Sequence, residues 1–355
     1  MDWNDIVLEA RHRRASDIHM VCGQPLRFRV DGSLTNFDDH VLTPADCESM
    51  GRELCGEQFS EIEKMGEIDL ARSFAGHIRC RINAFRQQGC VSAAVRLLSS
   101  QIPVLENLGL PESVYQFVDY PRGIVLVTGE TGSGKSTTMA AMLDRINHSR
   151  NEHIITLEDP IEYVYAQDRC TINQREIGRD TASYASGLRS ILREDPDVIL
   201  IGELRDLETI ETALTAAETG HLVFATVHTN SAADTVDRLV SVFPSEKQQQ
   251  IRLQLSTTLC AALAQQLLPR KNGEGRVLAC EVLIANTAIR SLIREGKTSQ
   301  INNAIATSAA DGNISMDTAL IRLVKNNSIS AETAFRAAHD AGYVKKSLQG
   351  TVSRW

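Results

Sequence analysis

The segment GETGSGKST, residues 129–137, restricts the fold of this chain more than any other part of the sequence. It matches the phosphate-binding pattern G-x-x-x-x-G-K-[ST], follows the apolar segment GIVLVTG and leads into the helix-like segment TTMAAMLDRIN. In such a loop backbone N–H groups face phosphate oxygens, Lys135 reaches the β- and γ-phosphates, and Ser136 can bind Mg²⁺. The residues expected at the nucleotide are Gly129, Thr131, Gly132, Ser133, Gly134, Lys135, Ser136 and Thr137.

The segments around this loop predict a parallel α/β sheet. Near-continuous apolar runs occupy residues 123–129, 153–159, 197–203 and 222–229, and helical or loop stretches separate them. Strands that are buried on both faces of a parallel sheet have this composition. Helices are expected to dominate beyond about residue 245, where apolar side chains recur at every fourth position, at Ile251, Leu255, Leu259, Leu263 and Leu267.

The first part of the chain has a different pattern, typical of a small antiparallel sheet with helices. RFRVDG (27–32) alternates and ends in an Asp-Gly turn, and HIRCRINAF (77–85) places Ile78, Cys80 and Ile82 on one face. The proline-containing stretch that follows predicts a connecting segment. We therefore expect an N-terminal α+β domain over 1–98, a linker over 99–120 and an ATPase domain over 121–355, within the 355 residues.

Acidic side chains follow two of the predicted strands, where an NTPase needs carboxylates to hold metal and position water. Glu158, Asp159 and Glu162 follow the strand that ends near residue 158. The segment VILIGELRD (198–206) resembles a Walker B strand, but Gly202 stands where the usual metal-binding Asp is expected, and Glu203 follows it. Each acid alone could be a solvated loop carboxylate or a helix cap, whereas the group favours hydrolysis.

Histidines and arginines form a second set of candidates. His221 and His228 lie at opposite ends of the predicted strand in TGHLVFATVHTN (219–230) and are either structural or hydrogen-bonded to the γ-phosphate. Arg79, Arg81 and Arg96 could form the solvated face of the first sheet, or could act in trans on a nucleotide bound elsewhere.

Composition argues against several classes of protein. The formal net charge of −8 and the aromatic content of 5% argue against a dedicated nucleic-acid binder. The apolar segments are strand-sized, far short of the ~20 residues that span a bilayer, so any membrane association is expected through a partner. The eight cysteines include no CxxC pair and no signal peptide precedes them, which predicts reduced thiols.

Taken together, GETGSGKST, TLEDPIEY, REDPDVILIGELRD, TGHLVFATVHTN and AIRSLIREGKT closely resemble the secretion-superfamily ATPases, and among them the PilT-type retraction ATPases of type IV pili. The resemblance extends from ASDIHM (15–20) to ISMDTAL (314–320), nearly the whole chain. The Gly-Glu ending of the Walker B segment is itself characteristic of this superfamily.

The resemblance implies a PAS-like N-terminal domain, a flexible linker and a RecA-like P-loop domain with a helical C-terminal region. It also implies a cytoplasmic homohexamer at the inner membrane with ATP and Mg²⁺ between subunits, working with a membrane platform protein and a paralogous accessory ATPase. The roles implied by matching motifs are water activation by Glu162 and contact with Mg²⁺ by Glu203 and Ser136. His228 is expected to contact the γ-phosphate, with His221 as its companion. Arg81 and Arg96 are expected to approach the phosphates, and Glu158 and Asp159 to belong to the nucleotide-binding site.

The helix-like segment AIRSLIREGKTSQI (288–301) resembles a motif tied to retraction in these ATPases. Ile289, Leu292 and Ile293 are expected to pack inward, while Arg290, Arg294 and Glu295 face a partner. The segment 268–283 lacks the four-cysteine zinc insert that assembly and secretion ATPases commonly carry, which favours a retraction motor. The alternatives are a type II or IVB secretion or conjugation ATPase, a DNA translocase, and a nucleotide-binding regulator that does not hydrolyse ATP.

Overall fold

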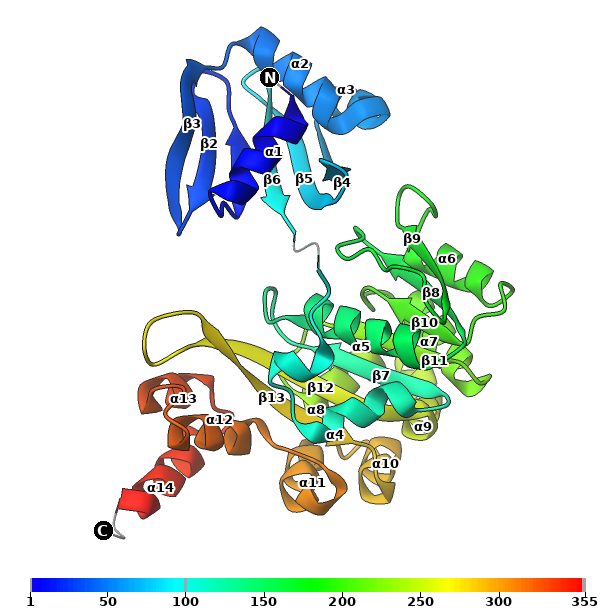
Figure 1. The fold of residues 1–355 in the computed structure, drawn as a ribbon. Helices are drawn as coiled ribbons and strands as arrows, with labels where there is room; N and C mark the ends of the chain where they lie inside the picture. Colours follow the sequence, from blue (N-terminus) through cyan, green and yellow to red (C-terminus); the bar gives the residue numbers. More distant parts are fainter. Residues whose placement is uncertain (1, 99–100, 353–355) are drawn as a thin grey trace. The chain divides into compact units, whose positions relative to one another are not determined.

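The computed structural model describes residues 2–98 and 101–352. The chain divides into two compact units, one of Met1–Ile102 with Pro160–Val164 and one of Pro103–Asp159 with Tyr165–Trp355 (Figure 1). Residues 99 and 100 of the predicted linker, and residues 353–355 of the predicted ATPase domain, lie outside the described residues.

The first unit is built on a six-stranded antiparallel sheet in the order β3-β2-β1-β6-β5-β4. Its strands are β1 Asp17–Met20, β2 Pro25–Val30, β3 Ser33–Val41, β4 Glu67–Phe74, β5 Ile78–Gln87 and β6 Cys90–Leu97, and its helices are α1 Trp3–His12, α2 Pro44–Cys55, η1 Gly56–Gln58 and α3 Phe59–Met65. Asp31 and Gly32 both have positive φ at the β2–β3 turn. Ile78, Cys80 and Ile82 are buried, as the alternation predicts.

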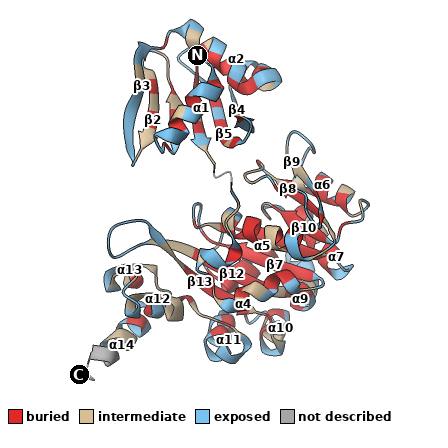
Figure 2. Cartoon of the chain, viewed as in Figure 1, coloured by how far each residue is buried: buried red, intermediate tan, exposed pale blue. Residues whose placement is uncertain are grey.

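The second unit is built on a seven-stranded sheet in the order β13-β12-β7-β11-β10-β8-β9. Its strands are β7 Gly123–Thr128, β8 His153–Glu158, β9 Thr171–Glu176, β10 Val198–Ile201, β11 Leu222–Val227, β12 Leu259–Pro269 and β13 Arg276–Ile284. All neighbours pair in parallel except β12 and β13. Every residue of β7, β10 and β11 is buried (Figure 2), which confirms the predicted parallel α/β sheet.

Helices cover this sheet and extend beyond it. They are η2 Leu105–Leu108, α4 Glu112–Tyr115, η3 Gln116–Asp119, α5 Lys135–Ser149, α6 Tyr184–Ile191, α7 Leu207–Glu218, α8 Ala232–Ser241, α9 Ser245–Thr258, α10 Thr287–Arg294, η4 Thr298–Gln300, α11 Ile301–Thr307, η5 Ala309–Asp311, α12 Met316–Lys325, α13 Ala331–Ala337 and α14 Ala341–Val352. Many begin at a polar N-cap that accepts a backbone N–H bond, as Asp206, Ser231 and Ser315 do.

The helical prediction for the apolar repeat over residues 251–267 is wrong beyond Thr258. Helix α9 ends there, and Leu259–Pro269 forms β12, which pairs with β7 on one side and β13 on the other. A repeat of four is also a multiple of two, so Leu263 and Leu267 share one face of the strand, beyond an irregularity in pairing between Leu259 and Ala261. Pairing with β7, which the local pattern cannot reveal, decides between the two.

Residues 103–119 form short helical turns that pack within the second unit. Leu105, Val114 and Phe117 are buried there, and η2 and η3 lie against α5. Among the helices of residues 2–98 and 101–352, none is long and apolar enough to cross a membrane.

Candidate nucleotide site

The phosphate loop joins the end of β7 to the start of α5, as the motif predicts. Gly129, Gly132 and Gly134 all have positive φ, which L side chains rarely adopt. A Cβ at Gly129 would also overlap the carbonyl oxygen of Gln265 on β12. The first position of the motif therefore requires glycine for two reasons, its backbone conformation and the strand beside it.

Lys135 is buried inside this loop. Its Nζ donates hydrogen bonds to the carbonyl oxygens of Gly129, at 2.7 Å, and of Glu130, at 2.9 Å. Ser136 follows it in the first turn of α5 and is exposed. A buried ammonium group, an exposed hydroxyl and the N-terminus of a 15-residue helix thus converge on one loop, which is the chemistry of a phosphate site.

The place of the expected Walker B aspartate has no room for a side chain. A Cβ at Gly202 would lie 2.7 Å from the Tyr184 hydroxyl oxygen and 3.1 Å from the Leu157 carbonyl oxygen. The Gly202 N–H donates to that same carbonyl oxygen at 2.7 Å, which holds the two backbones together. The departure from the usual motif therefore has a steric cause in β8 and α6.

Glu203 and His228 are brought together at the carboxyl edge of the sheet. They follow β10 and β11, which pair in parallel, and His228 Nε2 lies 3.4 Å from Glu203 Oε1. Arg205 Nε also contacts Glu203 Oε1, at 2.7 Å. Arg205 was not predicted as a site residue, although it lies only two residues after Glu203 in the sequence.

The acidic stretch of residues 158–162 begins at the last residue of the neighbouring strand, β8. Glu158 Oε1 accepts hydrogen bonds from Thr156 Oγ1 at 2.8 Å and Gln174 Nε2 at 3.1 Å. Burial, followed by the negative charges of Asp159 and Glu203, raises the pKa of Tyr184 far above its usual value. Tyr184 thus remains a neutral phenol beside these carboxylates, and no sequence motif indicated it.

Glu162, Arg81 and Arg96 lie in the first unit. Glu162 belongs to Pro160–Val164, and Arg79 Nε donates to the Ile161 carbonyl oxygen in the same unit at 3.0 Å. Arg81 pairs with Asp69 at 2.6 Å and Arg96 with Asp17 at 3.0 Å. The roles proposed for these three residues at a nucleotide stay predictions.

His221 is not brought to the phosphate loop. It precedes β11, whose first residue pairs with Gly123 at the start of β7, whereas the loop follows the other end of β7. A six-residue strand separates the two edges by about 20 Å. His221 Nδ1 instead lies 2.9 Å from the Ala216 carbonyl oxygen, so within this chain the His221 ring hydrogen-bonds to the last turn of α7.

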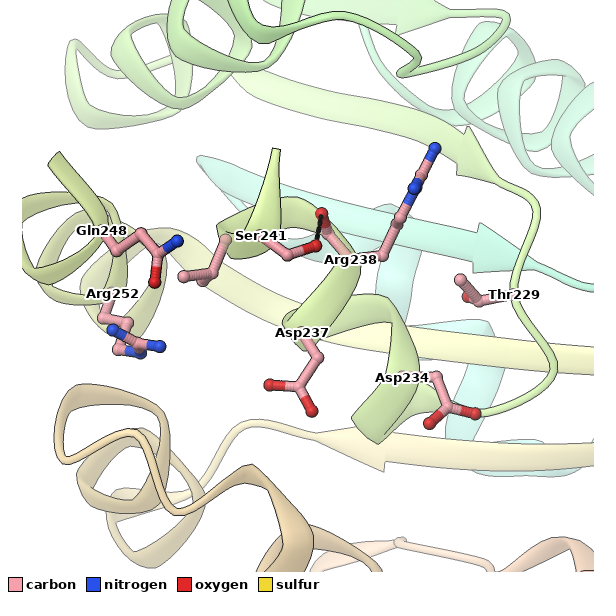
Figure 3. Close-up of a pocket in the computed structure, with 8 residues that line it drawn as sticks. Thr229, Asp234, Asp237, Arg238, Ser241, Gln248 and Arg252 are labelled. Atoms are coloured by element: carbon pink, nitrogen blue, oxygen red, sulfur yellow. Dashed lines mark hydrogen bonds between the residues drawn. The ribbon is translucent and has the colours of Figure 1, made fainter. Parts of the chain in front are cut away.

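A cavity of about 410 Å³ opens beside the turn that follows β11 (Figure 3). Thr229, Asp234 and Asp237 line one part of it, and Gln248 and Arg252 of α9 line another. The predicted phosphate-contacting residues do not line this cavity. It therefore lies next to the site without forming part of it.

Helix α10 carries the predicted motif of residues 288–301. Ile289 and Ile293 are fully buried, as expected. The expectation for Arg290 is wrong: instead of facing a partner, it donates from Nη1 to the Ser256 carbonyl oxygen at 2.8 Å and to that of Thr257 at 3.0 Å. These carbonyls belong to the last turn of α9, which has no intrahelical donors left for them. Arg294 and Glu295 are exposed.

We expect Arg290→Ala to lower the free energy of unfolding by about 2 kcal/mol, because it leaves the α9 carbonyl oxygens without a charged donor. Arg294→Ala, at an exposed position of the same helix, should change it by less than about 0.5 kcal/mol. Urea denaturation of both variants measures the difference. Equal stability of the two would contradict a capping role for Arg290.

Comparisons with known proteins agree with this site. The family model for the type II/IV secretion system protein matches residues 2–326. PilT of Pseudomonas aeruginosa, a type IV pilus retraction ATPase, is 45% identical over 94% of this chain and 97% of that protein. The twitching motility protein of Neisseria gonorrhoeae is 49% identical over 88% of this chain and 84% of that protein. A crystal structure of the pilus retraction motor PilT with bound ADP matches with a TM-score of 0.91 and 46% identity, over 98% of this chain and 99% of that one.

The parallel sheet, the phosphate loop and the acidic edge together define a P-loop ATPase of RecA-like fold. The chain belongs to the type II/IV secretion system protein family and is PilT-like within it. The family, the fold class and the ATPase class that the sequence predicts are thereby confirmed.

Proposed function

We propose that this chain hydrolyses Mg-ATP to drive retraction of a type IV pilus. The observation that carries the proposal is the similarity to retraction and twitching motility proteins along nearly the whole chain, including an intact phosphate loop. The buried ammonium group of Lys135 inside that loop supports nucleotide binding independently of the resemblance.

The proposed chemistry assigns a task to each group. Lys135 and the loop amides neutralise the phosphates, and Ser136 and Glu203 hold Mg²⁺, partly through water. An exposed hydroxyl and a carboxylate whose side chain is 18% exposed are the hard oxygen donors that this ion prefers. His228, whose Nε2 lies 3.4 Å from Glu203 Oε1, orients that carboxylate and contacts the γ-phosphate. Glu162 activates the attacking water, as the resemblance implies.

The proposed assembly is a cytoplasmic homohexameric ring that acts on a platform protein of the inner membrane and works with a paralogous accessory ATPase. Differential binding of ATP and ADP would bias the two units between arrangements, as in other hinge-closing proteins. The chain would reach the membrane only through its partners.

Glu203→Gln in the native host tests whether the protein drives retraction or assembly of the pilus. We expect surface pili to increase and surface motility to be lost, because filaments grow but cannot be withdrawn when the site binds nucleotide without hydrolysing it. Electron microscopy gives the pilus count, and a motility assay gives the rate of spreading.

Glu112→Gln is the matched control, since Glu112 is an exposed glutamate of α4 away from the site. It should leave both measurements unchanged. Loss of pili in the Glu203→Gln strain would indicate an assembly motor. Normal pili with impaired secretion or DNA transfer would indicate a secretion or conjugation ATPase.

A further inference from the structure

Strand β13 carries a buried carboxylate that the proposed chemistry does not use. Glu281 is 1% exposed. A buried carboxylate without partners is strongly destabilising, so the groups that face it indicate why it is tolerated.

Two helices direct their first N–H groups at Glu281. Its Oε1 accepts from the Ala232 N–H, at the start of α8, at 2.9 Å, and its Oε2 accepts from the Met316 N–H, at the start of α12, at 3.4 Å. The His339 ring lies 3.7 Å from Oε2. Burial raises the pKa of Glu281, whereas the two amides and His339 oppose that shift. The carboxylate is thus shared by three segments that are distant in sequence.

On the α8 side, these contacts lead to the nucleotide site. The turn before α8 carries His228 and Thr229, and the Thr229 N–H donates to Thr128 Oγ1 at 3.0 Å. Thr128 Oγ1 in turn donates to the Thr229 carbonyl oxygen at 2.6 Å. Thr128 is the last residue of β7, directly before the phosphate loop. The turn with His228 is therefore held between that loop's strand and Glu281.

On the other side, the contacts lead to the C-terminal helices. Asp317 of α12 accepts from the N–H groups of His339 and Asp340, at 2.8 and 3.0 Å, which ties α12 to the segment between α13 and α14. Helix α12 lies against β13 (Figure 1), and an apolar cluster joins the three helices to Ala279 of that strand. Glu281 lies where this helical module meets α8.

We propose that Glu281 is a positioning residue that couples the turn carrying His228 to helices α12–α14, so that nucleotide binding at the phosphate loop changes the order of those helices. The coupling rests on the proposed function only in requiring that nucleotide binds at the loop. According to this proposal, α12–α14 are the part of this unit whose order depends on whether nucleotide is bound at the phosphate loop.

Amide hydrogen exchange of the full chain, with and without Mg-ADP, tests the coupling in wild type and in Glu281→Gln. Without nucleotide, the variant should exchange about tenfold faster at residues 229–240 and at 312–325 together, because an amide N–H₂ replaces one acceptor oxygen. With Mg-ADP, wild type should gain protection at residues 129–140 and also at 312–325. The variant should keep the first effect and lose at least half of the second.

Two further variants complete the test. His339→Gln alters the more exposed end of the same contact. It should raise the rate of amide exchange at residues 229–240 and 312–325 about twofold, and this result can be obtained even if Glu281→Gln fails to fold. Glu332→Gln removes the exposed pair with Arg336 in α13 and should loosen neither. ATP turnover of Glu281→Gln should show a kcat lowered about tenfold with KM for ATP within twofold, because Lys135 is untouched.

Loosening of one segment without the other would overturn the coupling, as would full ADP protection at 312–325 in folded Glu281→Gln. These outcomes are distinct from failure of the proposed function, which would appear as no protection of residues 129–140 in wild type. In that case the exchange of the nucleotide-free proteins still decides whether Glu281 links residues 229–240 to residues 312–325.

Discussion

Lys135→Ala is expected to lower the kcat of ATP hydrolysis by the purified protein at least about a hundredfold. The ammonium group is buried inside the phosphate loop and bonded to two of its carbonyl oxygens, so it both shapes the loop and brings the positive charge that transferred phosphate requires. Phosphate release measured at saturating Mg-ATP gives kcat, and titration with a fluorescent ATP analogue gives the loss of binding.

Lys247→Ala is the matched control, because this half-exposed lysine of α9 pairs with Glu211 at 3.3 Å on the surface. It should retain wild-type turnover. Near-normal turnover in Lys135→Ala, with both variants folded, would remove the phosphate loop from the mechanism and with it the proposed function.

The strands around the phosphate loop could be predicted because two independent patterns agree there. The motif requires a strand before Gly129 and a helix after it, and the flanking segments have those compositions. The clustering of Glu203 and His228 could also be anticipated, since the carboxyl ends of parallel strands lie at one edge. In both cases a local pattern and a rule of sheet geometry lead to the same arrangement.

Other features could not be predicted, because they depend on contacts between segments that are distant in the sequence. The leucines after Thr258 fit a helix and a strand equally well, and only pairing with β7 selects the strand. His221 was expected at the nucleotide as the companion of His228, but the parallel register of β11 with β7 places only His228 at the edge that carries the phosphate loop. Arg290 was expected to face a partner, yet its guanidinium group donates to the carbonyl oxygen of Thr257 at the end of α9, 33 residues earlier in the sequence. Each difference comes from a tertiary contact that overrides a local pattern.

Gly202→Asp, which would restore the usual Walker B residue, is expected to destabilise the protein by about 3 kcal/mol and to reduce ATP turnover. The new Cβ would lie 2.7 Å from the Tyr184 hydroxyl oxygen and 3.1 Å from the Leu157 carbonyl oxygen, so β8 and α6 would have to move apart. The added carboxylate would also join Asp159 and Glu203, whose charges already act on Tyr184. Urea denaturation measures the cost.

Gly202→Ala adds the Cβ without the charge, and so measures the steric part of the loss in stability. Tyr184→Phe removes the hydroxyl oxygen, which is the closest atom that the new Cβ would meet. In the Tyr184→Phe background the cost of Gly202→Ala should fall by at least half, since the Leu157 carbonyl oxygen then remains as the main contact. An unchanged cost would place the strain in the backbone of β8 instead of α6. A stable and active Gly202→Asp protein would contradict the steric account, and the glycine would then require a reason in the chemistry of Glu203.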